Sequence, residues 1–181
     1  MEKIKRIILM GHGASGKDYA RKLFENFLGL KYGVSYTTRP PREGEVEGKD
    51  YYFITKERFQ EMIDKNLWYE YVEFNGWLYG TTKEQFYNQD NLFIMTPKGL
   101  SHLSETDRNE SSVIYFDIPE NIRKERMIQR KGNADSVERR LIADKKDFSD
   151  ITEKDYDYRI TSPNFTIEDL ENILKRNLIE A

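Results

Sequence analysis

The sequence has 181 residues, which is enough for one well-buried core and lies within the usual range of a single domain. Its formal net charge of −3 argues against a broad surface for nucleic acid or for an anionic membrane, so we expect neither partner. The absence of cysteine excludes disulfides and thiolate metal sites and fits a reducing compartment, so we expect a cytoplasmic protein.

The chain opens with a predicted strand, a glycine-rich turn and a helix. Residues Lys5–Met10 are rich in branched apolar side chains, which is typical of a strand buried on both faces of a parallel sheet. After the turn, apolar residues recur at helical spacing from Ala20 to Leu28, and Gly29 closes the pattern.

The remaining elements alternate between strands and helices, with one interruption. Short aromatic segments broken by turn residues predict a small mixed β insertion at 32–79, with one short helix within it. Residues 92–95 and 113–118 predict two more buried strands. Pro119 is expected as the first residue of a helix, and a very charged helix follows at 136–148, so that the two form a mobile flap. The last strand is expected at 158–161, and a final helix is expected to be capped by Thr166.

The turn after the first strand fits the phosphate-binding pattern G-x-x-x-x-G-K. The glycines let backbone N–H groups converge on phosphate oxygens, the following helix adds its positive end, and Lys17 reaches the outer phosphates. A plain glycine-rich turn is the alternative, but the position between a buried strand and an amphipathic helix favours a nucleotide. The residues assigned to the phosphates of ATP are Gly11, Gly13, Ser15, Gly16, Lys17 and Asp18.

Asp18 stands where Ser or Thr normally places a hydroxyl on Mg²⁺. A carboxylate about 4 Å from a phosphate charge costs about 4 kcal/mol at an effective dielectric constant of 20, so a cation is expected between them. Asp18 is therefore our candidate ligand for the Mg²⁺ that accompanies ATP. The alternative is a degenerate loop that no longer binds a metal nucleotide.

The segment from Ser35 to Arg42 carries two arginines held by a Pro-Pro pair. Guanidinium groups bind oxyanions through two parallel hydrogen bonds, so the pair suits a second phosphate. Taken alone, such a segment is more often a solvated turn.

The stretch from Val34 to Glu84 closely resembles guanylate kinases, and the resemblance extends more weakly over nearly the whole chain. It rests on S-x-x-T-R-P-P-R, G-E-V-x-G-x-D-Y, the acid of Tyr69-Glu-Tyr71 and Y-G-T-T-K-E. The resemblance implies an α/β fold with a P-loop three-layer core and a parallel sheet (1–34, 81–125 and 151–181), a mixed β monophosphate-binding insertion (35–80) and a helical lid (126–150). It also implies the conversion of ATP and GMP or dGMP into ADP and GDP or dGDP by a monomer or homodimer.

The resemblance also implies a set of acceptor-binding residues: Ser35, Arg39, Arg42, Tyr51, Glu70, Tyr79, Thr81 and Thr96. The acceptor phosphate is expected to bind Arg39, Arg42 and Tyr51, with Tyr79 beside them. The base is expected to contact Ser35, Glu70, Thr81 and Thr96. A carboxylate at Glu70 can accept from the N1–H and 2-amino groups of guanine. Adenine would leave it facing a lone pair, and a buried unmatched polar group costs about 1–3 kcal/mol.

Three lid arginines complete the implied machinery. Arg126 and Arg130 are one helical turn apart and share a face, and Arg140 follows in the second lid helix. Such charge runs are usually solvated faces. The resemblance favours instead a catalytic set of Lys17 and the three arginines acting on the transferring phosphoryl group.

The chain departs from the family where a D-x-D is usual at the end of the strand after the insertion. The equivalent residues here are Ile94 and Thr96, so both carboxylates are missing. Thr96 can keep only a weaker hydrogen bond to the base, and we hypothesise that Asp18 offsets the acid lost near the metal.

Two rival functions therefore stay open: a kinase of the same fold for another deoxynucleotide or a sugar phosphate, and a non-catalytic guanylate-kinase-like binding module. Retention of Lys17, of both acceptor arginines and of the lid arginines argues against the second.

Overall fold

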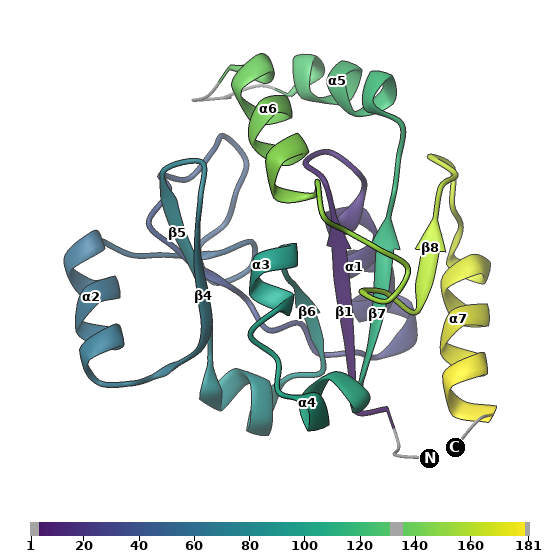
Figure 1. Ribbon diagram of the computed structural model, residues 1–181, viewed down its shortest axis with the longest axis horizontal. Helices are drawn as coiled ribbons and strands as arrows, with labels where there is room; N and C mark the ends of the chain where they lie inside the picture. Colours follow the sequence, from purple (N-terminus) through teal and green to yellow (C-terminus); the bar gives the residue numbers. More distant parts are fainter. Residues whose placement is uncertain (1–3, 131–135, 180–181) are drawn as a thin grey trace.

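The computed structural model describes residues 4–130 and 136–179, so residues 131–135 of the expected lid and the two ends of the expected core lie outside the described residues. At the centre is a parallel sheet with the strand order β6-β1-β7-β8 (Figure 1). Its strands are β1 (Arg6–Gly11), β6 (Leu92–Ile94), β7 (Ser111–Phe116) and β8 (Tyr158–Ile160). Every residue of β1 and β7 is buried, which explains the unbroken apolar runs and confirms the predicted α/β core.

Helices cover both faces of this sheet. On one face, α1 (Lys17–Leu28) and α7 (Ile167–Ile179) bury Phe24 and Leu170 against β1 and β7. On the other face, Phe86 and Leu100 pack on the sheet from η1 (Gln85–Gln89) and α3 (Pro97–Leu100). The short helix α4 (Glu105–Asn109) leads into β7.

The predicted ends of two helices are confirmed. Gly29 follows α1 in the left-handed conformation, with φ at 67°, and its N–H group is bonded to the carbonyl of Phe24. At the start of α7 the Thr166 hydroxyl accepts from the Asp169 N–H group at 3.4 Å, while the Asp169 carboxylate accepts from the Thr166 N–H group at 2.7 Å.

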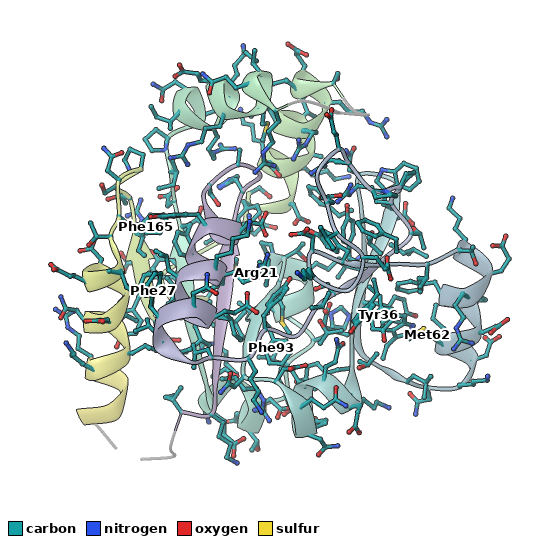
Figure 2. The ribbon with its side chains drawn as sticks, turned by 180° about the vertical axis from the view of Figure 1, so that it is seen from behind. Arg21, Phe27, Tyr36, Met62, Phe93 and Phe165 are labelled. Atoms are coloured by element: carbon teal, nitrogen blue, oxygen red, sulfur yellow. The ribbon has the colours of Figure 1, made fainter. Side chains whose placement is uncertain are left out.

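A second sheet, with the order β3-β2-β5-β4, occupies the predicted insertion. Its strands are β2 (Tyr36–Thr37), β3 (Tyr52–Phe53), β4 (Trp68–Phe74) and β5 (Trp77–Thr82). The β2–β3 pair is parallel and the other pairs are antiparallel, so the sheet is mixed, as predicted. Helix α2 (Lys56–Asp64) closes a separate small core in which Phe59 and Met62 pack on Trp68. Figure 2 shows Met62 and Tyr36 in this part, far from Phe165 beside α1 and α7.

Two charged helices lie above the carboxyl ends of the parallel strands, α5 (Glu120–Gln129) and α6 (Val137–Asp147) (Figure 1). Pro119 is the residue before α5 rather than its first residue, because its ψ of 141° is extended, not helical. The Ser136 hydroxyl accepts from the Arg139 N–H group at 3.1 Å and so begins α6. In the part of the chain that the structure describes, no helix is both long and apolar enough to cross a membrane.

Candidate active site

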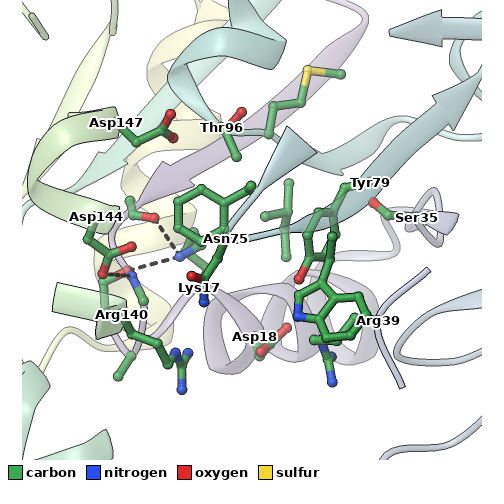
Figure 3. A pocket seen from close by; sticks show the side chains of 18 of the residues that line it. Lys17, Asp18, Ser35, Arg39, Asn75, Tyr79, Thr96, Arg140, Asp144 and Asp147 are labelled. Atoms are coloured by element: carbon green, nitrogen blue, oxygen red, sulfur yellow. Dashed lines mark hydrogen bonds between the residues drawn. The ribbon is translucent and has the colours of Figure 1, made fainter. Parts of the chain in front are cut away.

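A pocket of about 530 Å³ lies between the loop after β1, the second sheet, and helices α5 and α6 of the expected lid. Figure 3 shows Asp144 and Arg140 at one end of it, and Ser35, Arg39 and Tyr79 at the other. The predicted site residues that line it are Gly11, Gly13, Ser15, Gly16, Lys17, Asp18, Ser35, Arg39, Arg42, Tyr51, Glu70, Tyr79, Thr96, Arg126, Arg130 and Arg140. Residues from three distant segments are thus brought to one cavity.

The predicted phosphate-binding loop connects the end of β1 to the start of α1. Gly16 has a φ of 96° and Ala14 a φ of 59°, a left-handed conformation that is uncommon outside glycine. The Lys17 amine donates to the backbone carbonyls of Gly11 at 2.6 Å and His12 at 2.7 Å. Burial, together with the charges of Arg130 and Arg123, lowers the pKa of this amine to about 8, against the opposing effect of Asp18 and Asp144.

Asp18 lies in the pocket wall with its side chain 66% exposed and a carboxylate oxygen 3.9 Å from Nε of Arg21. A second acid, Asp147 at the end of α6, also lines the pocket, and its Oδ2 is buried without a hydrogen-bond partner. Carboxylate oxygens are ligands that Mg²⁺ prefers, and Mg²⁺ bound with a nucleotide needs only one or two of them. Both residues therefore fit the metal ion that the family implies. Among residues 4–130 and 136–179 no group of three or more His, Asp or Glu side chains is arranged to hold a metal ion.

At the far end of the pocket, Glu45 contacts both of the arginines that are predicted to bind the acceptor phosphate. Its carboxylate accepts from the guanidinium of Arg39 at 2.7 Å and from the backbone N–H group of Arg42 at 2.7 Å. Burial and the charge of Arg39 lower the pKa of the Arg42 guanidinium. Burial and then Arg42 likewise lower the pKa of Arg140, so the insertion and the lid bring like charges together. An anion between them would relieve this repulsion.

Glu70 on β4 forms the buried acidic wall of the pocket. Its side chain accepts hydrogen bonds from the hydroxyl and the backbone N–H group of Thr81, and burial raises its pKa to about 7. Thr81 is only 1% exposed and does not line the pocket, so its contact is with Glu70. Thr96 begins α3, and its hydroxyl accepts from the N–H group of Gly99 at 3.0 Å.

The lid contributes both predicted and unpredicted residues. Arg126 donates to the carbonyls of Ala14 and Pro163, each at 3.1 Å, and so joins the loop after β1 to the segment after β8. Sequence reasoning missed Asp144 and Asp147 on α6. In the sequence these acids flank two lysines, a pattern typical of a solvated helix face, so no local signal distinguishes them.

Known proteins resemble this chain along nearly its whole length. A family model described as guanylate kinase matches residues 3–180. The chain is 32% identical to the guanylate kinase of Geobacter metallireducens over 96% of this chain and 88% of that protein, and 30% identical to that of Wolinella succinogenes over 86% and 77%. The crystal structure of guanylate kinase from Anaplasma phagocytophilum matches with a TM-score of 0.70 and 25% identity, over 99% of this chain and 87% of that one. The chain therefore belongs to the guanylate kinase family of nucleoside monophosphate kinases.

Proposed function

We propose that this protein transfers the γ-phosphoryl group of ATP to GMP or dGMP, giving ADP and GDP or dGDP. One observation carries the proposal: a single pocket joins the phosphate-binding loop and Lys17 to the acceptor arginines and to a buried carboxylate at Glu70. A donor phosphate and an acceptor phosphate can bind in that pocket with the transferring group between them.

In the proposed reaction a phosphate oxygen of the acceptor forms a bond to the γ-phosphorus of ATP, and the bond from that phosphorus to the β–γ bridging oxygen breaks. The protein does no covalent chemistry, so catalysis rests on positioning and on stabilising charge. Arg39, Arg42 and Tyr51, with Tyr79 beside them, hold the acceptor phosphate. The amine of Lys17 and the guanidinium groups of Arg126, Arg130 and Arg140 stabilise the transferring group.

We assign the Mg²⁺ that accompanies ATP to Asp18, with Asp147 as a second carboxylate in the same pocket. When bound there, Mg²⁺ would supply positive charge to the phosphate oxygens. Asp18 thus takes the place of the acid that the family carries at position 94, where this chain has Ile94.

The base of the acceptor is assigned to Ser35, Glu70 and Thr96, which line the pocket. The ionised Glu70 accepts two hydrogen bonds from guanine, while Thr81 acts on the base by holding that carboxylate in place. Adenine cannot donate from N1, so the desolvated carboxylate disfavours AMP.

Lid helix α6 approaches the insertion as well as the loop: a Cβ at Gly76, in the β4–β5 hairpin, would lie 3.7 Å from a guanidinium nitrogen of Arg139. Such closure keeps water from the transferring phosphoryl group. We further propose that the protein works in the cytoplasm as a monomer or homodimer, without nucleic acid or membrane partners.

Steady-state kinetics with GMP, dGMP, AMP, dTMP and a panel of sugar phosphates, followed by ADP formation, tests this proposal. Activity with GMP or dGMP and little with AMP is the expected result. Preference for dTMP or a sugar phosphate would support instead the rival kinase that the loss of acids at Ile94 and Thr96 leaves open. Absence of ATP and GMP binding by calorimetry would support the non-catalytic binding module.

A further inference from the structure

A carboxylate of the lid occupies a backbone donor of the phosphate-binding loop. The N–H group of Gly13 donates to Oδ2 of Asp144 at 2.8 Å, and Asp144 is only 4% exposed. Backbone N–H groups of such a loop are the donors that receive phosphate oxygens. An anionic oxygen at hydrogen-bond distance from one of them resembles a bound phosphate in charge and in position.

Asp144 is held in this position by the lid itself. Nη1 of Arg123, on α5, lies 3.4 Å from the same Oδ2 atom, and both side chains are buried. Because one oxygen is shared between the guanidinium of α5 and the N–H group of the loop, the contact links both lid helices to Gly13.

Two further contacts bind the lid to the same segment of the loop. The ring of His12 stacks on Phe148, just after α6, with ring centres 4.1 Å apart and planes at 25°. A Cβ on Gly13 would lie 2.9 Å from Cε of Met127 and 3.1 Å from Oδ2 of Asp144. The lid therefore rests directly on His12 and Gly13.

Two donors of the loop thus have partners within the protein, because the Lys17 amine donates to loop carbonyls and the Gly13 N–H group donates to Asp144. A phosphate of ATP that approaches Gly13 meets a carboxylate already bound there. Two anionic oxygens cannot share one N–H donor without repulsion, so one of them must leave.

We propose that Asp144 is a latch that imitates a donor phosphate, joins the lid to the loop through Gly13, and is displaced from Gly13 when ATP binds. The proposal rests on ATP binding to this loop but not on the identity of the acceptor. The latch costs ATP affinity, because binding must break the contact between Asp144 and Gly13.

The test is calorimetry of ATP and ADP binding to the full chain, first with EDTA and then with Mg²⁺. Asp144→Asn keeps the shape of the side chain but removes its charge. In EDTA this variant is expected to bind ATP about tenfold more tightly than the natural protein, which corresponds to about 1.4 kcal/mol. Glu138→Gln is the matched control, since it removes an exposed carboxylate from the first turn of the same helix, outside the pocket and away from Gly13, and its affinity is expected to change much less.

Equal tightening in both variants would reduce the effect to a general loss of negative charge and would overturn the latch. Unchanged or weaker ATP binding by Asp144→Asn in EDTA would overturn it too. Weakening confined to Mg²⁺ would make Asp144 a metal ligand instead, again against the proposal. If Asp144→Asn folds poorly, the double variant Arg123→Met and Asp144→Asn, which leaves no unpaired buried guanidinium, replaces it under the same criteria.

Nuclear magnetic resonance gives a readout that does not depend on activity. The Gly13 amide proton, bonded to a carboxylate, is expected to resonate at lower field in the natural protein than in Asp144→Asn, and to shift when ATP is added. A Gly13 resonance that is unaffected by Asp144→Asn would contradict the latch. If Asp144→Asn shifts the Gly13 resonance strongly but the natural protein does not bind ATP, the contact between Asp144 and Gly13 would be supported and the proposed ATP site would be refuted.

Discussion

The Cα atom of Gly99 leaves just enough room for the carboxylate of Glu70: a Cβ built on the glycine would lie 2.9 Å from Oε2 of Glu70. Side chains at this distance cannot coexist without movement, and Glu70 is itself fixed by the hydroxyl and backbone N–H group of Thr81. The identity of residue 99 therefore sets the position of the group that we assign to guanine recognition.

Replacing Gly99 by Ala is expected to displace Glu70 and raise KM for GMP about tenfold, the loss of roughly one charge-assisted hydrogen bond. KM for ATP should change little. Ser101→Ala, in an exposed residue just after α3, is the matched control. An unchanged KM for GMP in Gly99→Ala would show that Glu70 does not read the base.

Burial raises the pKa of Glu70 to about 7, and guanine pairs with the ionised form. We therefore expect KM for GMP to rise as the pH falls from 8 to 6, approaching about tenfold per pH unit below the pKa. Glu70→Gln should show a higher KM that does not follow this pH dependence. A flat profile in the natural protein would mean that the carboxylate does not act in GMP binding.

The same shift predicts a dependence of stability on pH. Between the ordinary pKa of about 4.5 and the raised value near 7, the folded protein binds the proton and the unfolded chain does not, so the free energy of unfolding falls as pH rises. Denaturant titrations at pH 5 and pH 7.5 should show this fall, and Glu70→Gln should show a smaller one. An equal fall in the natural protein and in Glu70→Gln would contradict the raised pKa of Glu70.

The lowered pKa of Lys17 predicts that ATP binding is coupled to proton uptake. Burial is the main cause that lowers the pKa of Lys17 to about 8, and a bound phosphate would stabilise the ammonium form. ATP binding at pH 8 should therefore take up about half a proton, because the amine is half protonated at its pKa. Calorimetry in buffers of different ionisation enthalpy measures this number, and proton release on binding would contradict the prediction.

Asp18 tests the hypothesis that the loop replaces the acid lost at Ile94. Asp18→Ser is expected to lower kcat with Mg²⁺ about tenfold or more, since a charged ligand typically contributes more than 1 kcal/mol. Asp18→Glu, which keeps the carboxylate, should retain more activity. Activity that is unchanged or higher in Asp18→Ser would refute the compensation.

Much of the fold could be predicted from local sequence because local physics decides it. The apolar run of β1, the glycines around Lys17 and the stop at Gly29 each set backbone structure within a few residues, and these predictions are confirmed. The mixed insertion could be predicted because turn residues separate its short strands. The predicted start of α5 was wrong by one residue, because Pro119 has an extended ψ and the helix begins at Glu120.

The contacts of the lid could not be predicted in this way. Asp144 and Gly13 are 131 positions apart. Their hydrogen bond depends on which face of the charged helix α6 is turned toward the loop after β1. The low amphipathic contrast of α6 leaves that orientation to tertiary packing, including the stacking of Phe148 on His12. The burial of Thr81 behind Glu70 is a similar case. The alternation of inward and outward side chains along β5 does not reveal which neighbour accepts the hydrogen bond from the Thr81 hydroxyl.

The most direct measurement is the analysis of products after the protein is incubated with ATP and an equimolar mixture of GMP and AMP, with nucleotides separated by ion exchange and phosphate assayed. We expect GDP and ADP in equal amounts, little consumption of AMP and little free phosphate. Formation of ADP with free phosphate and no GDP, or consumption of AMP in preference to GMP, would contradict a guanine-specific phosphoryl transfer in this pocket.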